Sequence, residues 1–241
     1  LRIAAAFHDL GKANDGFQDM LRRQGDQLIR HEHLSVLLLG HEGFLTWVAQ
    51  LPEIDWDLVL SAIACHHLKT GVDEFGENVL GPPRTTFRVS SDHPDFEELL
   101  TLIAYEISIS HQPLPTLPID WSFSPKSNCY HLEPLRKILT RRLQTFGKEV
   151  RKDDAKRRLL WAVRSGLIVA DSVGSGIVRT GEDIFTWIDT VLDRDRICDT
   201  EYVQAQIIEK RIEQLKAQGR WKDWSDFQTD CGELPERALL L

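Results

Sequence analysis

The sequence predicts an all-α fold, a helical bundle with long loops. Apolar residues recur at helical spacing through most of the chain, strand-like alternation is scarce, and two stretches rich in Gly and Pro interrupt the pattern. With 241 residues, of which 42% are hydrophobic, the chain can bury a substantial core. We therefore expect residues 1–241 to form one helical domain.

The first three helices are expected over 1–10, 28–49 and 57–67. Apolar residues in 1–10 have helical spacing, and Gly11 stands where a helix would end. Residues 28–49 carry a longer series of apolar side chains, namely Leu34, Leu37, Leu38, Phe44, Leu45 and Val48. The run VLSAIAC then predicts that 57–67 is a buried helix that ends in two histidines.

Five further helices complete the prediction. The pattern places them at 96–110, 132–144, 152–171, 184–192 and 201–218. The last has alternating charges, which are typical of a solvated helix. Residues 70–95 and 112–130 are rich in Gly, Pro and polar residues, so we expect long loops there.

Charge is distributed unevenly. The net charge of −8 argues against the binding of nucleic acid, because its phosphates are bound mainly by Lys and Arg. Residues 136–164 reverse this locally, because they hold eleven Lys or Arg against three acids, a local charge of +8. A solvated helix surface and a nucleic-acid contact explain this segment equally well.

The four cysteines lie far apart and none forms a CxxC motif, so neither a zinc knuckle nor a disulfide framework is indicated. No apolar run approaches the roughly 20 residues that a membrane helix needs. We expect a cytoplasmic protein with no membrane partner.

Candidate metal ligands come from three consecutive predicted helices. They are His8 and Asp9, then His31, then His66 and His67. A divalent metal that activates water needs several nitrogen or carboxylate ligands. Asp171, which follows the apolar run GLIVA, would add a second carboxylate.

An isolated His-Asp or His-His pair more often has no metal. Here, however, each pair directly follows an apolar helical run, IAAAF before His8 and VLSAIAC before His66. Buried ionisable groups are costly unless they are paired, and a metal would satisfy them. The order of these pairs therefore predicts a two-metal centre in which Asp9 bridges the ions.

Four motifs in this order resemble a known family. HDLGK (8–12), RHEHLS (30–35), AIACHH (62–67) and GLIVADSVGS (166–175) resemble the HD nuclease domain of the CRISPR-associated nuclease-helicase of type I interference systems. The resemblance implies an HD-domain bundle whose metal ligands are His8, Asp9, His31, His66, His67 and Asp171. It implies that Lys12 contacts the scissile phosphate and that Ser175 is a further substrate contact.

The resemblance also implies cofactors and partners. Two divalent metals are expected. Mn, Fe, Co or Ni are favoured because imidazole suits these metals better, and Mg stays possible. The expected partners are single-stranded DNA, a helicase domain of the same protein and an RNA-guided CRISPR surveillance complex. Arg157 and Arg158, in the basic segment, are the candidate contacts to the strand.

The family has one more metal-ligating histidine upstream of the His-Asp pair, and no histidine precedes His8 here. Both ends of the sequence are expected to be cut: Leu1 begins inside an apolar helix, and about 220–241 resembles a linker and the start of a helicase domain. The chain contains no GxxxxGK[ST] motif for ATP.

The resulting prediction is a metal-dependent nuclease that cleaves single-stranded DNA in CRISPR interference. Two alternatives stay open. One is an HD phosphohydrolase for nucleotides or cyclic dinucleotides, and the other is a catalytically idle HD module that mediates interactions.

The remaining histidines are expected to have no role in the centre. His31 and His33 are two residues apart on a helix, so only one can face the metals, and the other should face solvent. The motif favours His31. We expect His41, His93, His111 and His131 at the surface or in loops.

Overall fold

The structure is a computed structural model that describes residues 1–25, 28–51, 54–67 and 86–180, together with a few isolated positions beyond them. Side chains are described up to Gly174 in the last continuous range. The chain divides into two compact units, Leu1–Val173 and Gly174–Leu241. The helices expected at 184–192 and 201–218, and the segment 220–241, lie outside the continuously described ranges.

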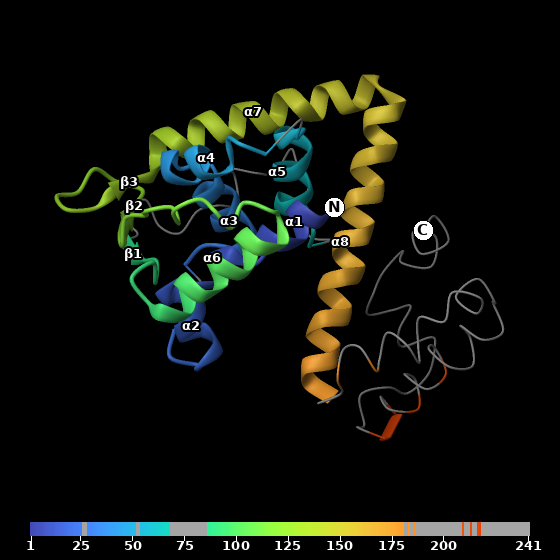
Figure 1. Ribbon diagram of the computed structural model, residues 1–241, viewed down its shortest axis with the longest axis horizontal. Helices are drawn as coiled ribbons and strands as arrows, with labels where there is room; N and C mark the ends of the chain where they lie inside the picture. Colours follow the sequence, from blue (N-terminus) through green and yellow to red (C-terminus); the bar gives the residue numbers. More distant parts are fainter. Residues whose placement is uncertain are drawn as a thin grey trace. The chain divides into compact units, whose positions relative to one another are not determined.

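Helices dominate the described residues, as the sequence predicts (Figure 1). They are α1 (Arg2–Phe7), α2 (Asp15–Leu21), α3 (His31–Leu39), α4 (Glu42–Val48), α5 (Trp56–Ala64), α6 (Pro94–Glu106), α7 (Leu132–Lys152) and α8 (Asp154–Thr180), with a 3-10 turn, η1 (Leu10–Lys12). The all-α fold class is therefore confirmed. None of these described helices has the length and apolar character needed to cross a membrane.

The single helix expected over 28–49 is two helices. α3 ends at Leu39, and His41 begins α4 by accepting a hydrogen bond at its Nδ1 from the amide of Gly43, 3.1 Å away. His41 is only 5% exposed and lies edge-on to Trp121 and Tyr130. His41 thus lies in the short connection between α3 and α4, as expected of a surface or loop residue, but its side chain is buried against the sheet.

α7 and α8 are longer than predicted. The buried stripe of α7 continues through Leu143, Phe146 and Val150, so the helix does not stop near residue 144. Asp153 then separates the two helices, and its carboxylate accepts the amides of Ala155 and Lys156 at 2.9 and 3.1 Å. This is the hydrogen bonding expected of an N-cap, and it starts α8 directly after α7.

Three short strands form a small sheet inside the two stretches predicted to be loops. β1 (Thr86–Arg88) pairs antiparallel with β2 (Asp120–Ser122), which pairs parallel with β3 (Tyr130–His131). Each strand has only two or three residues, too few to show alternation in the sequence. Phe87 and Trp121, which are partners in register, bury the inner face of the sheet.

The core lies where α1, α3, α5 and α7 meet. α3 contacts α5 and α7, and α1 contacts α5. Phe7 of α1 packs edge-on against Phe44 and Trp47 of α4 at centroid distances of 6.1 and 6.3 Å. All nine residues of α3 are buried, so α3 is the central helix of this unit.

Candidate metal centre

The His8-Asp9 pair lies in a tight turn between α1 and η1. α1 ends at Phe7, three residues earlier than expected, so His8 and Asp9 leave the helix. Ser35 of α3 holds this turn: its hydroxyl donates to the carbonyl of His8 at 2.7 Å and accepts the amide of Gly11 at 2.8 Å. Asn14 adds a side-chain hydrogen bond to the Gly11 carbonyl.

Gly11 allows the turn to lie directly against α3. A Cβ atom at this position would lie 2.0 Å from the carbonyl oxygen of His31 and 2.7 Å from the amide nitrogen of Ser35. Both atoms are backbone and cannot rotate away. Gly11 is thus required by close approach, not by the helix end that the sequence suggested.

His66 and His67 also follow a helix end. α5 ends at Ala64 and not at residue 67. The Nδ1 of His66 donates to the carbonyl of Ile63 at 2.7 Å, and the Nδ1 of His8 donates to the carbonyl of Ala5 at the same distance. Since a carbonyl can only accept, both rings carry a proton on Nδ1, which leaves Nε2 as the atom that a metal would bind.

His31, the first residue of α3, joins these pairs. Its Nε2 lies 3.0 Å from the Nε2 of His67 and 3.4 Å from Oδ1 of Asp9. Its Nδ1 lies 3.5 Å from Oε2 of Glu32, which is 1% exposed and pairs with Arg30. Sequence reasoning missed this role of Glu32, although the triplet Arg30-His31-Glu32 carries the signal.

Asp171 and Lys12 complete the cluster. Oδ1 of Asp171, inside α8, lies 3.6 Å from Nε2 of His8. Nζ of Lys12 lies 2.5 Å from Oδ2 of Asp9 and 5.9 Å from the ring centre of Phe17. The structure thus brings together all six predicted ligands and Lys12.

The ligand atoms form two overlapping groups, His31-His66-His67 and His8-Asp9-His66, and within each group they lie within 4.8 Å of one another. Nε2 of His66 and Oδ1 of Asp9 are buried and have no hydrogen-bond partner among the described residues. Buried polar atoms without partners are costly. Imidazole and carboxylate together suit Mn, Fe, Co or Ni, so the donor set fits a pair of divalent metals.

Burial and neighbouring charges set the protonation of this cluster. Burial alone would raise the pKa of Asp9, but hydrogen bonds and charge from His8 and Lys12 outweigh it and hold that pKa well below its usual range. Burial lowers the pKa of His31 to about 4, and it also lowers that of His66. The pKa of His8 is raised, because Asp9, the Ala5 carbonyl and Asp171 outweigh its burial. Asp9 is therefore an anion, and His31 and His66 are neutral, as metal ligands must be.

His33 belongs to neither ligand group. It is fully buried, so the prediction that it faces solvent is wrong. The helical rotation between His31 and His33 is as expected, but α3 has no exposed side to which His33 could turn. Burial lowers the pKa of His33 to about 4.

The metal-free chain is expected to lose stability in mild acid. The pKa of His31 and of His33 is about 4 when folded against an ordinary value of 6.5, so the unfolded chain binds protons first as the pH falls. Their contribution is full above pH 6.5 and is lost towards pH 4. Urea unfolding in EDTA should give a free energy of unfolding at least about 2 kcal/mol lower at pH 5 than at pH 7. This figure allows for His8, whose raised pKa offsets part of the loss.

The control for this titration is His93→Gln, since His93 is exposed at the start of α6. This variant should keep the full dependence on pH. A free energy of unfolding that stays constant or rises between pH 7 and pH 5 would contradict the burial of the two neutral histidines.

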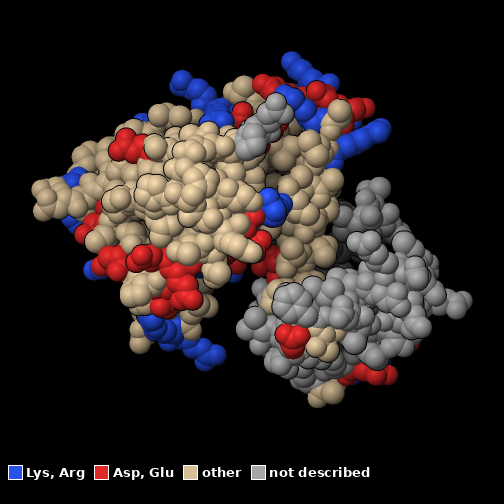
Figure 2. Space-filling model, in the orientation of Figure 1, with Lys and Arg blue, Asp and Glu red and all other residues tan. Residues whose placement is uncertain are grey.

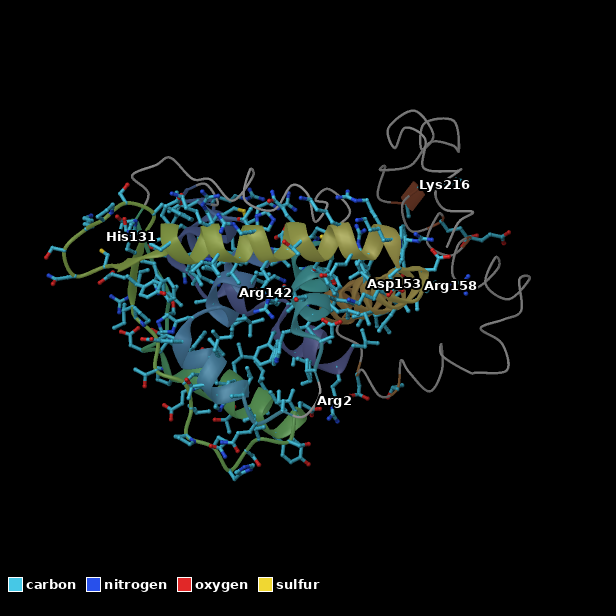
Figure 3. The ribbon with its side chains drawn as sticks, turned by 90° about the horizontal axis from the view of Figure 1, so that it is seen from above. Arg2, His131, Arg142, Asp153, Arg158 and Lys216 are labelled. Carbon is cyan, nitrogen blue, oxygen red and sulfur yellow. The ribbon has the colours of Figure 1, made fainter. Side chains whose placement is uncertain are left out.

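The basic segment 136–164 covers α7 and the first part of α8 (Figure 2). Among the contacts between described residues, five of its cations form ion pairs: Arg136 and Lys137 with Glu133, Arg142 with Asp57, Lys156 with Glu149 and Arg157 with Asp154. Figure 3 shows Arg142 along α7, and Asp153 and Arg158 where α7 meets α8. The side chain of Ser175 lies outside the described residues.

A helical bundle that brings His-Asp and His-His pairs together in a cluster suited to divalent metals is the arrangement of the HD class of metal-dependent hydrolases. Residues 1–88 match the family model of the HD domain. Over 194 residues the chain is 34% identical to a protein of Myxococcus xanthus (strain DK1622) with the provisional name CRISPR-associated nuclease/helicase Cas3. The chain therefore carries an HD domain of the type found in these CRISPR-associated nuclease/helicases.

The match covers 79% of this chain and 25% of the Myxococcus protein, so the chain spans about a quarter of the length of that relative. No solved structure matches the chain at a significant level.

Proposed function

We propose that this chain hydrolyses phosphodiester bonds in single-stranded DNA with two divalent transition metals, as the nuclease part of a CRISPR interference protein. The observation that carries the proposal is the convergence of His8, Asp9, His31, His66, His67 and Asp171 on one place, with Lys12 beside it. The name of the Myxococcus relative, a CRISPR-associated nuclease/helicase, supports nuclease chemistry and a helicase partner. The single-stranded DNA substrate and the RNA-guided surveillance complex rest on the motif resemblance.

The residues of the cluster would have two roles, to hold the metal ions and to balance their charge. His31, His66 and His67 would hold one ion and His8 with Asp171 the other, while Asp9 lies between them with one oxygen near His31 and the other near His8. When bound, the ions would supply an activated water and neutralise the phosphate. Arg30 and Glu32 orient the His31 ring, and the Ala5 and Ile63 carbonyls orient His8 and His66.

Lys12 is the cation nearest to the proposed reaction centre. Without substrate its ammonium pairs with Oδ2 of Asp9, in a site where both side chains are about one-third exposed. A phosphate that enters here would meet this ammonium. Its positive charge would then stabilise the negative charge that develops on the phosphate oxygens during hydrolysis.

The decisive experiment compares substrates with the chain as it stands. In Mn²⁺ we expect cleavage of a labelled single-stranded oligonucleotide and much slower hydrolysis of dNTPs and cyclic dinucleotides. EDTA should remove all activity. Hydrolysis of nucleotides with the oligonucleotide left intact would instead support the HD phosphohydrolase alternative.

Metal content separates both enzymes from an idle HD module. Titration with Mn²⁺, followed by calorimetry, should show tight binding that His31→Ala weakens and that His111→Ala, at an exposed position, does not change. A chain that binds no Mn²⁺ with all six ligands present would support the idle module.

A further inference from the structure

One side of α8 extends from Asp171 of the metal centre and carries two arginines along its length. Arg157, Arg164 and Asp171 are spaced seven residues apart, which is almost two helical turns, so successive members differ by only about 20° around the axis. Arg164 and Arg157 therefore lie about 10 and 21 Å from Asp171 along the same side of the helix. Leu160, Val163 and Leu167 pack into the core next to this side.

Arg164 has hydrogen-bonding capacity to spare. Its Nε is buried, yet that atom has no hydrogen-bond partner among the described residues. The guanidinium lies 6.0 Å from the ring centre of Trp161, one turn earlier on α8. A planar guanidinium that lies near an aromatic ring, and whose Nε has no acceptor among the described residues, is suited to a phosphate.

Trp161 is 55% exposed, which is unusual for the largest apolar side chain. It lies about 60° around the helix from Arg164, on the side away from the core. An exposed aromatic ring beside cations is the combination that single-strand binding proteins use, because any base can stack on the ring while the cations follow the backbone.

Arg157 and Arg158 are adjacent in the basic segment, but they lie on different sides of α8. Arg157 lies about 40° from Asp171 around the axis, whereas Arg158 lies about 140° away. Arg157 pairs with Asp154 of its own helix, and both are substantially exposed, so the pair is weak and a phosphate can replace it. Leu159 is 53% exposed and lies on the opposite flank, about 120° from Asp171.

We propose that Arg157, Trp161 and Arg164 form a track on which a single nucleic-acid strand lies as it reaches the metal centre. The two arginines bind phosphates, and Trp161 stacks on a base between them. This inference rests on the proposed function and adds to it the part of α8 that binds the strand outside the reaction centre.

The test measures binding of a fluorescein-labelled dT20 oligonucleotide by anisotropy in EDTA, where it cannot be cleaved. Trp161→Ala should weaken binding at least about fivefold, the lower end of what one stacked base contributes. Arg164→Gln should weaken it similarly and reduce the slope of log K against log salt by about one. Arg164→Lys, which keeps the charge but not the planar group, should restore the slope and only part of the affinity.

Leu159→Ala and Arg22→Gln are the matched controls, an exposed apolar residue on another side of α8 and an exposed cation at the end of α2. Each should change the affinity less than twofold, and circular dichroism checks that every variant is folded. Equal losses in all four variants would overturn the track alone. A wild-type chain that neither binds dT20 in EDTA nor cleaves it in Mn²⁺ would overturn the proposed function as well.

Discussion

Asp9→Ala is expected to abolish metal-dependent phosphodiester hydrolysis, with a loss of at least about 100-fold, since even the outer partners of metal ligands can cost that much. Asp9 lies between the two ligand groups, with Oδ1 3.4 Å from His31 and Oδ2 3.2 Å from His8. In the proposed two-metal centre, its removal takes away a ligand and the negative charge that would balance two cations. Oligonucleotide cleavage in Mn²⁺ measures the loss.

The matched control is Asp19→Ala, because Asp19 is a half-exposed aspartate on α2. It should keep full activity. Circular dichroism should show that Asp9→Ala retains its helices, since α1 and α3 do not depend on that carboxylate for their backbone hydrogen bonds. Cleavage by Asp9→Ala within a few fold of the wild-type rate would remove Asp9 from the proposed centre.

Gly11→Ala is expected to have the largest effect on stability. The new methyl group would lie 2.0 Å from the His31 carbonyl oxygen, and relief requires η1 and α3 to move apart. That movement would break the Ser35 hydrogen bonds to His8 and Gly11. We expect a loss of at least about 3 kcal/mol in the free energy of unfolding, the upper end of the usual cost of overpacking.

Gly174→Ala provides the opposite control within the same chain. Gly174 lies inside α8, and an added Cβ would meet no atom of the described residues within 4 Å. The better helix propensity of alanine should then stabilise the chain by about 0.5–1 kcal/mol. Urea unfolding of both variants measures the difference, and a Gly11→Ala chain as stable as wild type would refute the close packing of η1 on α3.

The helices could be predicted from the sequence because their buried residues recur every three or four positions. Helix ends could not, because local hydrogen bonds decide them. His41 divides the helix expected over 28–49 by capping α4 with its own ring. α5 ends at Ala64, and the His66 ring bonds back to Ile63. Neither interaction leaves a periodic signal.

The candidate centre was predictable as a set of residues but not as an arrangement. The His-Asp and His-His pairs stand out because each follows an apolar helix. Ser35, by contrast, acts on residues 24 and 27 positions earlier in the chain, and only the packed structure brings them together. The approach of Asp171 to His8 likewise depends on how α8 packs, since 163 positions separate the two residues.

His33 was assigned wrongly. A helix next to solvent has an outer side, and the prediction for His33 assumed one. His33 lies in α3, whose nine residues are all buried. Pattern alone cannot distinguish a helix surrounded by others from one at the surface, because LSVLLL is apolar enough for either.

The complete burial of α3 also determines how the site moves. Backbone amides in a fully enclosed central helix exchange with solvent only when the whole unit opens, in contrast to those of frayed ends and loops. His31 is the first residue of that helix, while His66 and His67 come after the end of α5. The proposed centre thus joins one ligand at the start of this enclosed helix to two others that follow the end of α5.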